Sequence, residues 1–175
     1  MTDKIDLSVI IPVYNEAKTC AEIIKRVQAI SIVNEIIVVD DASTDGTIDI
    51  LGTIDNIKVI RHEQNSGKGV AVRTGLAHVI GNYVITQDAD LEYDPNDYLK
   101  LAEPVVNGIT EVVYGSRWLN KPIEWNIHYL INQMITLYAN AFNDVFLTDI
   151  YTCYKLMPTT LLQVLDLFSN GSGME

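Results

Sequence analysis

Short apolar runs alternate with amphipathic stretches along most of this chain of 175 residues. The runs are rich in Val and Ile, which favours strands that are buried on both faces of a sheet. Between them, apolar residues recur at the spacing of helices that cover a sheet. Strands that alternate with helices predict an α/β fold with a mostly parallel sheet and helices on both faces. The predicted strands cover residues 7–13, 35–41, 57–60, 83–85 and 111–117, and the predicted helices lie at 20–30, after 47, at 72–80 and after 95.

Polar side chains stand where the predicted strands end. In an open sheet of this kind, ligands bind beyond the carboxyl ends of the strands. Four such ends, converging on one edge, predict a single binding site there. The polar residues concerned are Tyr14, Asn15, Glu16, Asp40, Asp41, Asp88, Asp90, Ser116 and Arg117.

Four acidic residues crowd into positions 88–94, directly after the fourth predicted strand. Because such a cluster repels itself, a bound cation and a phosphate-bearing ligand would give it a use. Asp88 and Asp90 would point the same way along an extended backbone. Carboxylate oxygens suit Mg²⁺ or Mn²⁺, which take one or two protein carboxylates beside water and phosphate oxygens. The alternative is a solvated acidic turn before a helix.

The longest amphipathic stretch predicts a helix from Asn126 to Phe146. A helix that covers the sheet is the favoured interpretation. One alternative is a helix in the plane of a membrane, which the lack of a polar face rich in Lys and Arg disfavours. Another is a face that binds a partner, such as a homodimer interface. The apolar stripe comprises Ile127, Leu130, Ile131, Met134, Ile135, Tyr138, Ala141, Phe142, Val145 and Phe146, broadened by Tyr129 and Leu137.

Composition narrows the class of protein further. Apolar residues make up 48% and charged residues 20%, as in a globular domain. A net charge of −11 argues against nucleic-acid binding and against broad adhesion to anionic lipid. Cys20 and Cys153 lie far apart and suggest no disulfide framework, which favours a reducing compartment such as the cytoplasm.

The ends of the chain lead to further expectations. The polar start at Met1–Asp6 does not resemble a signal peptide, and no run of about twenty apolar residues predicts a membrane span. The turn-like residues 170–175 lead into no closing element. We therefore expect a single domain over residues 1–175 that is truncated at its C-terminus.

Five motifs, taken together, resemble the inverting family 2 glycosyltransferases of GT-A fold. More closely, they look like the branch that glycosylates polyprenyl phosphates, which includes the dolichol-phosphate mannose synthases. The resemblance runs from about Leu7 to the C-terminus, and it implies a Rossmann-like nucleotide-diphospho-sugar transferase fold. The motifs are Pro12-Val13-Tyr14-Asn15-Glu16, Val38-Val39-Asp40-Asp41-Ala42-Ser43, Asn65-Ser66-Gly67-Lys68-Gly69, Gln87-Asp88-Ala89-Asp90 and Tyr114-Gly115-Ser116-Arg117.

The resemblance implies a nucleotide-sugar donor, either GDP-mannose or a UDP-hexose, and a polyprenyl or dolichyl phosphate acceptor. Matched by position, Pro12, Tyr14 and Glu16 would contact the nucleoside. Asp40 or Asp41 would hydrogen-bond the base or the ribose. A lipid acceptor would also imply peripheral association with the cytoplasmic face of the membrane.

The same resemblance gives the acidic stretch its roles. Asp88 would steady the ribose, with Ala89 beside it in the motif, and Asp90 with Glu92 would hold Mg²⁺ or Mn²⁺ on the diphosphate. Glu92 stands where mannose synthases carry Gln, so the donor stays open. Lys68 is either a donor contact or part of a turn that starts a helix.

Arg117, Asp149 and Lys155 would serve the acceptor side. Arg117 would meet a phosphate with its planar guanidinium. Asp149 would act as a base or orient Lys155, which replaces the Arg usual in the family and loses its bidentate geometry. Without the family, Asp149 reads as a turn residue and Lys155 as a surface charge.

Two other functions stay open. A saccharide acceptor would require Asp149 as general base. A non-catalytic module that binds a nucleotide sugar is the other alternative. An enzyme that uses a dinucleotide is disfavoured because no G-x-G-x-x-G follows the first strand.

Overall fold

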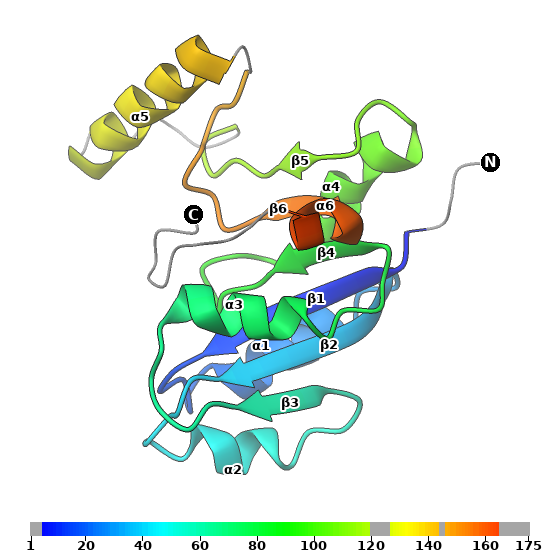
Figure 1. The fold of residues 1–175 in the computed structure, drawn as a ribbon, viewed down its shortest axis with the longest axis vertical. Helices are drawn as coiled ribbons and strands as arrows, with labels where there is room; N and C mark the ends of the chain where they lie inside the picture. Colours follow the sequence, from blue (N-terminus) through cyan, green and yellow to red (C-terminus); the bar gives the residue numbers. More distant parts are fainter. Residues whose placement is uncertain (1–4, 120–126, 144–145, 165–175) are drawn as a thin grey trace.

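The computed structural model describes residues 5–119, 127–143 and 146–164. A sheet forms its centre, and α5 stands apart from it at one end (Figure 1). The strands are β1 (Leu7–Val13), β2 (Val33–Asp40), β3 (Lys58–Arg61), β4 (Tyr83–Thr86), β5 (Val113–Tyr114) and β6 (Lys155–Pro158). The helices are α1 (Cys20–Gln28), α2 (Thr47–Leu51), α3 (Lys68–Leu76), α4 (Asp97–Val106), α5 (Ile127–Asn143) and α6 (Thr159–Val164).

The sheet has the strand order β3-β2-β1-β4-β6-β5. Strands β1 to β4 are parallel, and β6 runs antiparallel between β4 and β5. The prediction of a mostly parallel α/β sheet is therefore confirmed. β6 and α6 were not predicted. The sequence Lys-Leu-Met-Pro of β6 lacks the Val and Ile that mark the equally short β3 and β4.

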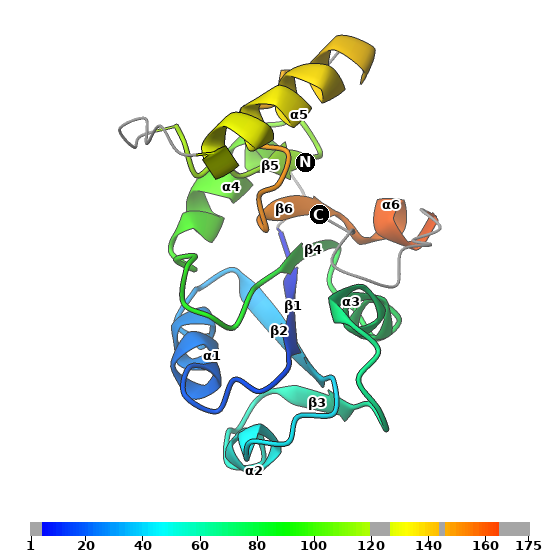
Figure 2. The same ribbon diagram turned by 90° about the vertical axis from the view of Figure 1, so that its left-hand side faces the viewer.

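Alternate residues of β1 divide the core into two layers. Val9, Ile11 and Val13 are buried in the larger cluster, together with residues of α1 and α4. Ile10 points to the other face, where it packs with Leu76 of α3. Figure 2 shows α1 and α4 on one side of the sheet and α3 and α6 on the other. This two-sided burial explains why β1 is apolar at every position except Ser8.

Gly75 allows α3 to lie directly on β1. A Cβ at this position would stand 2.6 Å from Cγ2 of Ile10, so a larger residue would push the helix off the sheet. The contact lies near the C-terminal end of α3, and Lys68 begins the helix at its other end. The helix thus delivers a cationic side chain to the edge at which β1, β2 and β4 end.

The prediction that the long helix covers the sheet is wrong. In both views α5 lies beyond β5 and β6, away from the parallel strands (Figures 1 and 2). Its buried side chains are Asn132 and Thr136, whereas Met134 and Leu137 are 72% and 70% exposed. The polar face of the helix therefore turns inward and the apolar face outward.

Polar side chains on one face of α5 explain this orientation. Asn132, Thr136 and Asn140 are four residues apart and bond to the segment that follows the helix. Thr136 Oγ1 accepts from the backbone N–H of Ile150, and Asn140 bonds to both backbone groups of Leu147. Buried polar backbone needs such partners, and apolar side chains could not supply them.

Some expectations fall outside the described residues. They concern Asn126 and Val145 within the predicted helix 126–146, the chain start at residues 1–4 and the turn at 170–175. Both cysteines are buried and free, in agreement with the absence of a predicted disulfide. Among the helices that the structure describes, none is long and apolar enough to cross a bilayer.

Candidate active site

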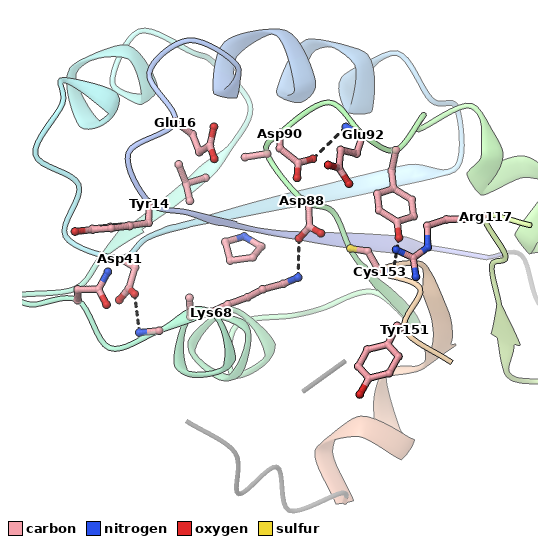
Figure 3. A pocket seen from close by; sticks show the side chains of 17 residues that line it. Tyr14, Glu16, Asp41, Lys68, Asp88, Asp90, Glu92, Arg117, Tyr151 and Cys153 are labelled. Carbon is pink, nitrogen blue, oxygen red and sulfur yellow. Dashed lines mark hydrogen bonds and ion pairs between the residues drawn. The ribbon is translucent and has the colours of Figure 1, made fainter. Parts of the chain in front are cut away.

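A cavity of about 550 Å³ opens at the carboxyl ends of β1, β2 and β4 (Figure 3). Its size is within the range of small-molecule sites. Ten of the residues given a predicted role line it, whereas Asp40, Asp149 and Lys155 do not, nor do Asn15 and Ser116 from the strand ends. The lining residues are Pro12, Val13, Tyr14, Glu16, Asp41, Asn65, Gly67, Lys68, Ala71, Asp88, Ala89, Asp90, Glu92, Tyr93, Arg117, Tyr151 and Cys153.

The loop after β1 forms one end of the cavity. Asn15 adopts a left-handed conformation, with φ of 57°, which turns the chain sharply after Tyr14. The Asn15 and Glu16 amides donate to hydroxyls of Ser43 and Thr47, which attach this loop to the loop after β2. Tyr14 remains 48% exposed beside the cavity. Its ring is therefore available to a planar ligand.

Asp41 anchors the glycine-rich loop that precedes α3. Its carboxylate accepts hydrogen bonds from the backbone amides of Ser66 and Gly67, and it contacts Nδ1 of His62 at 2.6 Å. Burial acts to raise the pKa of Asp41, but these hydrogen bonds outweigh it and leave the pKa below its usual value. Asp41 is therefore an anionic anchor at neutral pH. His62, whose Nε2 lies 2.9 Å from the Thr74 hydroxyl, links this anchor to α3.

Asp40 lies under the site rather than in it. The side chain is fully buried, accepts from the backbone amide of Ser43 and lies 3.2 Å from Nε of Arg61. Of the two carboxylates predicted to meet the base or ribose, Asp41 is the one that lines the cavity. Asp40 shapes the turn that carries it.

The acidic residues after β4 adopt a turn rather than an extended backbone. Leu91 has a φ of 66°, and Asp90 accepts a hydrogen bond from the amide of Glu92 at 3.0 Å. The prediction that the side chains of Asp88 and Asp90 point the same way along an extended backbone is therefore wrong. Instead, Asp88 pairs with Nζ of Lys68 at 2.9 Å, while all three carboxylates still line one cavity.

Two of these carboxylates fit a divalent cation. Asp90 and Glu92 are exposed to the cavity, and carboxylate oxygens are the ligands that Mg²⁺ and Mn²⁺ prefer. Within the described ranges, no group of three or more His, Cys, Asp or Glu side chains could hold a metal ion by itself. The donor set is therefore of the kind that a nucleotide diphosphate completes with its own oxygens.

Arg117 closes the opposite end of the cavity and is held from behind by Asp149. Nε and Nη2 of Arg117 donate to the two oxygens of Asp149 at 2.8 and 2.9 Å. Asn132 of α5 donates to the same carboxylate at 2.8 Å. Burial acts to raise the pKa of Asp149, but these hydrogen bonds outweigh it and lower the pKa. Asp149, which is 1% exposed, orients Arg117 and does not line the cavity.

Lys155 lies on β6, outside the cavity lining. Its Nζ stands 5.7 Å from the centre of the Tyr114 ring, at cation–π distance. Lys155, which was grouped with Arg117 and Asp149 on the acceptor side, therefore does not line the cavity that Arg117 closes. Asp149, which was expected to orient Lys155 or to act as a base, pairs with Arg117 instead.

Four lining residues, Ala71 of α3 among them, were not singled out from the sequence. Tyr93 follows Glu92, while Tyr151 and Cys153 arrive beside the site on the chain that leads into the unpredicted strand β6. The hydroxyl of Tyr93 accepts from the backbone amide of Cys153 and joins these segments. Burial, aided by the charge of Asp88, raises the pKa of the Cys153 thiol to about 12, so it stays protonated. Only the tyrosine within the acidic motif offered a sequence signal.

Comparisons with known proteins agree with this geometry. A UDP-N-acetylglucosamine–dolichyl-phosphate N-acetylglucosaminyltransferase of Methanococcus voltae is 32% identical, over 94% of this chain and 74% of the relative. A dolichol-phosphate mannosyltransferase of Pyrococcus furiosus is 36% identical, over 65% of this chain and 33% of that protein. This chain thus spans three quarters of the first relative and one third of the second. The predicted polyprenyl-phosphate branch fits both.

Solved structures share the fold. A glucosyl-3-phosphoglycerate synthase of Mycobacterium tuberculosis, crystallised with Mn²⁺, UDP and phosphoglyceric acid, superposes with a TM-score of 0.75 at 24% identity. The superposition covers 97% of this chain and 61% of that one, and it confirms the GT-A fold. Residues 8–164 match the model of the family described as Glycosyl transferase family 2. Because this match covers most of the chain, the chain belongs to glycosyl transferase family 2.

Proposed function

We propose that this glycosyltransferase moves a hexose from a nucleotide-diphosphate sugar to a polyprenyl phosphate. The observation that carries the proposal is one cavity with three chemically different parts (Figure 3). Tyr14 and Asp41 stand at one end, the acidic turn lies in the middle, and Arg117 stands at the other end. This order matches a base, a diphosphate and the phosphate of an acceptor.

The acidic turn and Lys68 would serve the diphosphate. Asp90 and Glu92 would hold Mg²⁺ or Mn²⁺, which when bound neutralises charge that develops on the leaving nucleoside diphosphate. Nζ of Lys68 lies 2.9 Å from a carboxylate oxygen of Asp88, and this ion pair holds the ammonium group inside the cavity. A cation fixed in this way attracts phosphate oxygens and aligns the donor.

The state of Asp149 supports a phosphate acceptor over a saccharide acceptor. A sugar hydroxyl needs a general base, and Asp149 was the candidate. Its carboxylate is buried, binds Arg117 and Asn132, and has a lowered pKa, all of which oppose proton uptake. A phosphate oxygen is already anionic at neutral pH and needs only positioning by Arg117.

The outward face of α5 supports an acceptor that lies in a membrane. The described helix contains no Asp, Glu, Lys or Arg, and its exposed side chains include Met134, Leu137, Tyr138 and Phe142. Its buried face reaches Arg117 through Asn132 and Asp149. We propose that this face, the α5 apolar face, rests on a lipid bilayer and brings the cavity to its lipid acceptor. The names of the two relatives above, each of which includes a dolichyl or dolichol phosphate, agree with this assignment.

The test is a transfer assay with a matched pair of acceptors. Radiolabelled UDP-N-acetylglucosamine, UDP-glucose and GDP-mannose are each offered with dolichyl phosphate or with dolichol, in the presence of Mn²⁺. We expect label in the phosphate acceptor only. Asp90→Asn should abolish transfer, while Glu63→Gln, which removes an exposed charge outside the cavity, should not. Equal transfer to dolichol, or transfer to neither acceptor, would overturn the proposal.

A further inference from the structure

A glutamine with no exposed surface lies directly before the acidic turn. Oε1 of Gln87 accepts hydrogen bonds from the hydroxyl of Tyr98 at 2.6 Å and from that of Tyr154 at 2.7 Å. The two rings meet edge to face, with centroids 5.3 Å apart. Tyr98 belongs to α4, and Tyr154 directly precedes β6. One amide oxygen therefore joins three separate parts of the fold.

The other end of the same amide holds the backbone of the acidic turn. Nε2 of Gln87 donates to the carbonyl oxygen of Asp88 at 2.9 Å. Because both tyrosine hydroxyls occupy the oxygen end, the nitrogen end must face this carbonyl. Burial raises the pKa of both tyrosines, so both hydroxyls keep their protons at neutral pH. The orientation of the amide is thus determined on both sides.

We propose that Gln87, with Tyr98 and Tyr154, is a positioning clamp that sets the direction of Asp88 and Asp90. The clamp acts through the Asp88 carbonyl, whose orientation decides where the turn begins. It touches neither donor nor metal, because none of its three side chains lines the cavity. The inference rests on the proposed function, in which these carboxylates serve a metal–nucleotide complex. Groups that orient metal ligands typically change metal affinity by about 10- to 100-fold when they are replaced.

A purely structural role would also explain a buried polar network, so the test must separate the two. Gln87→Met leaves two buried hydroxyls without an acceptor, and this costs stability whatever the network does. The triple variant Gln87→Met, Tyr98→Phe, Tyr154→Phe removes every polar partner except the Asp88 carbonyl. Replacing both sides of a hydrogen bond by apolar groups of similar shape is close to neutral for stability. The triple variant therefore restores packing without restoring the clamp.

Two measurements on these variants decide the question. Hydrogen–deuterium exchange of the amides at residues 89–92 reports the order of the turn without any ligand. Calorimetric titration of UDP and GDP with Mn²⁺ reports the metal–nucleotide site. Tyr83→Phe, on β4 but outside the clamp, is the matched control for loss of a tyrosine hydroxyl.

We expect the triple variant to melt near the temperature of the natural chain. Its turn amides should nevertheless exchange at least about ten times faster, and its affinity for the Mn²⁺-nucleotide complex should fall by about 10- to 100-fold. Natural exchange and natural affinity in a stable triple variant would overturn the clamp. If the natural chain binds neither nucleotide, the proposed function fails, while the exchange measurement still decides whether the clamp orders the turn.

Discussion

Helices α1 and α5 share an amphipathic pattern, yet they turn opposite faces to the protein. In α1 the apolar residues Ile23, Ile24 and Val27 are buried, and Glu22 pairs with Arg26 in solvent. Among the described side chains of α5 the buried ones are Asn132 and Thr136, and most of the large apolar ones are exposed. The polar face of α1 is charged, whereas that of α5 consists of amides and hydroxyls. Uncharged polar groups that find hydrogen-bond partners cost less free energy to bury than charged groups do.

Truncation of one apolar side chain to alanine in each helix tests most directly whether α1 and α5 bury opposite faces. Ile24 is fully buried, so Ile24→Ala should lower the free energy of unfolding by about 2–5 kcal/mol. Met134 is 72% exposed, so Met134→Ala should change it by less than about 0.5 kcal/mol. Chemical denaturation measures both. Similar losses at the two positions would mean that α5 buries its apolar face as α1 does.

A vesicle-binding experiment tests whether the exposed α5 apolar face contacts a bilayer, which α1 has no comparable face to do. Met134→Asp combined with Leu137→Asp should weaken binding to phosphatidylcholine vesicles, measured by flotation, by at least about 100-fold, because burial of each apolar side chain contributes about 1.5–3 kcal/mol. Ile80→Asp is the control, since Ile80 is 86% exposed but lies outside α5. A chain that ignores vesicles and forms a dimer, which the double variant dissociates, would contradict the membrane assignment and favour a second copy.

Asp149 links the inward face of α5 to the site, and its loss should depend on pH. Asp149→Asn should lower stability at neutral pH by about 2–3 kcal/mol through weaker hydrogen bonds to Arg117. The folded pKa of Asp149 is lowered, so below about pH 4 the unfolded chain binds more protons and the contribution disappears. The difference between variant and natural chain should therefore shrink as the pH falls through this window. A constant difference from pH 7 to pH 3 would rule out an ionised Asp149, and Asp55→Asn serves as an exposed control.

The smallest effect concerns Asn132 itself. Asn132→Leu makes α5 more apolar and a better helix former, yet it should lower stability by about 1–2 kcal/mol, because Asp149 and Thr136 each lose a partner. Asn143→Leu on the exposed end of the helix should be neutral within about 0.5 kcal/mol. Thermal melting compares the two. A stabilised Asn132→Leu variant would show that the polar face does not hold the helix.

Local patterns were enough to predict the parallel half of the fold and most of the cavity. β1 was predicted with its observed bounds, and the strand ends did bring Tyr14, Asp41 and Asp88 together. These features depend on burial and strand order, which short sequence patterns carry. The contacts of Asp149 could not be predicted, because they join the segment after β5, α5 and the segment after α5 across the chain.

The orientation of α5 and the role of Gln87 were beyond sequence analysis for a related reason. An apolar stripe shows that a helix has two faces, but the partners available to the polar face decide which one is buried. Asn132 finds Asp149 only in the folded chain. Gln87 likewise finds Tyr154 only because the unpredicted β6 lies beside β4.

Calorimetric titration of nucleotide sugars tests most directly whether this cavity is a metal-dependent donor site. UDP-N-acetylglucosamine, UDP-glucose and GDP-mannose are titrated into the natural chain and into Asp90→Asn, with Mn²⁺ and with a chelator. If Asp90 holds the metal on the donor, at least one donor should bind with Mn²⁺, and chelation or Asp90→Asn should abolish the binding. Donor binding that survives both changes, or the absence of binding by every donor, would contradict a metal-dependent donor site in this cavity.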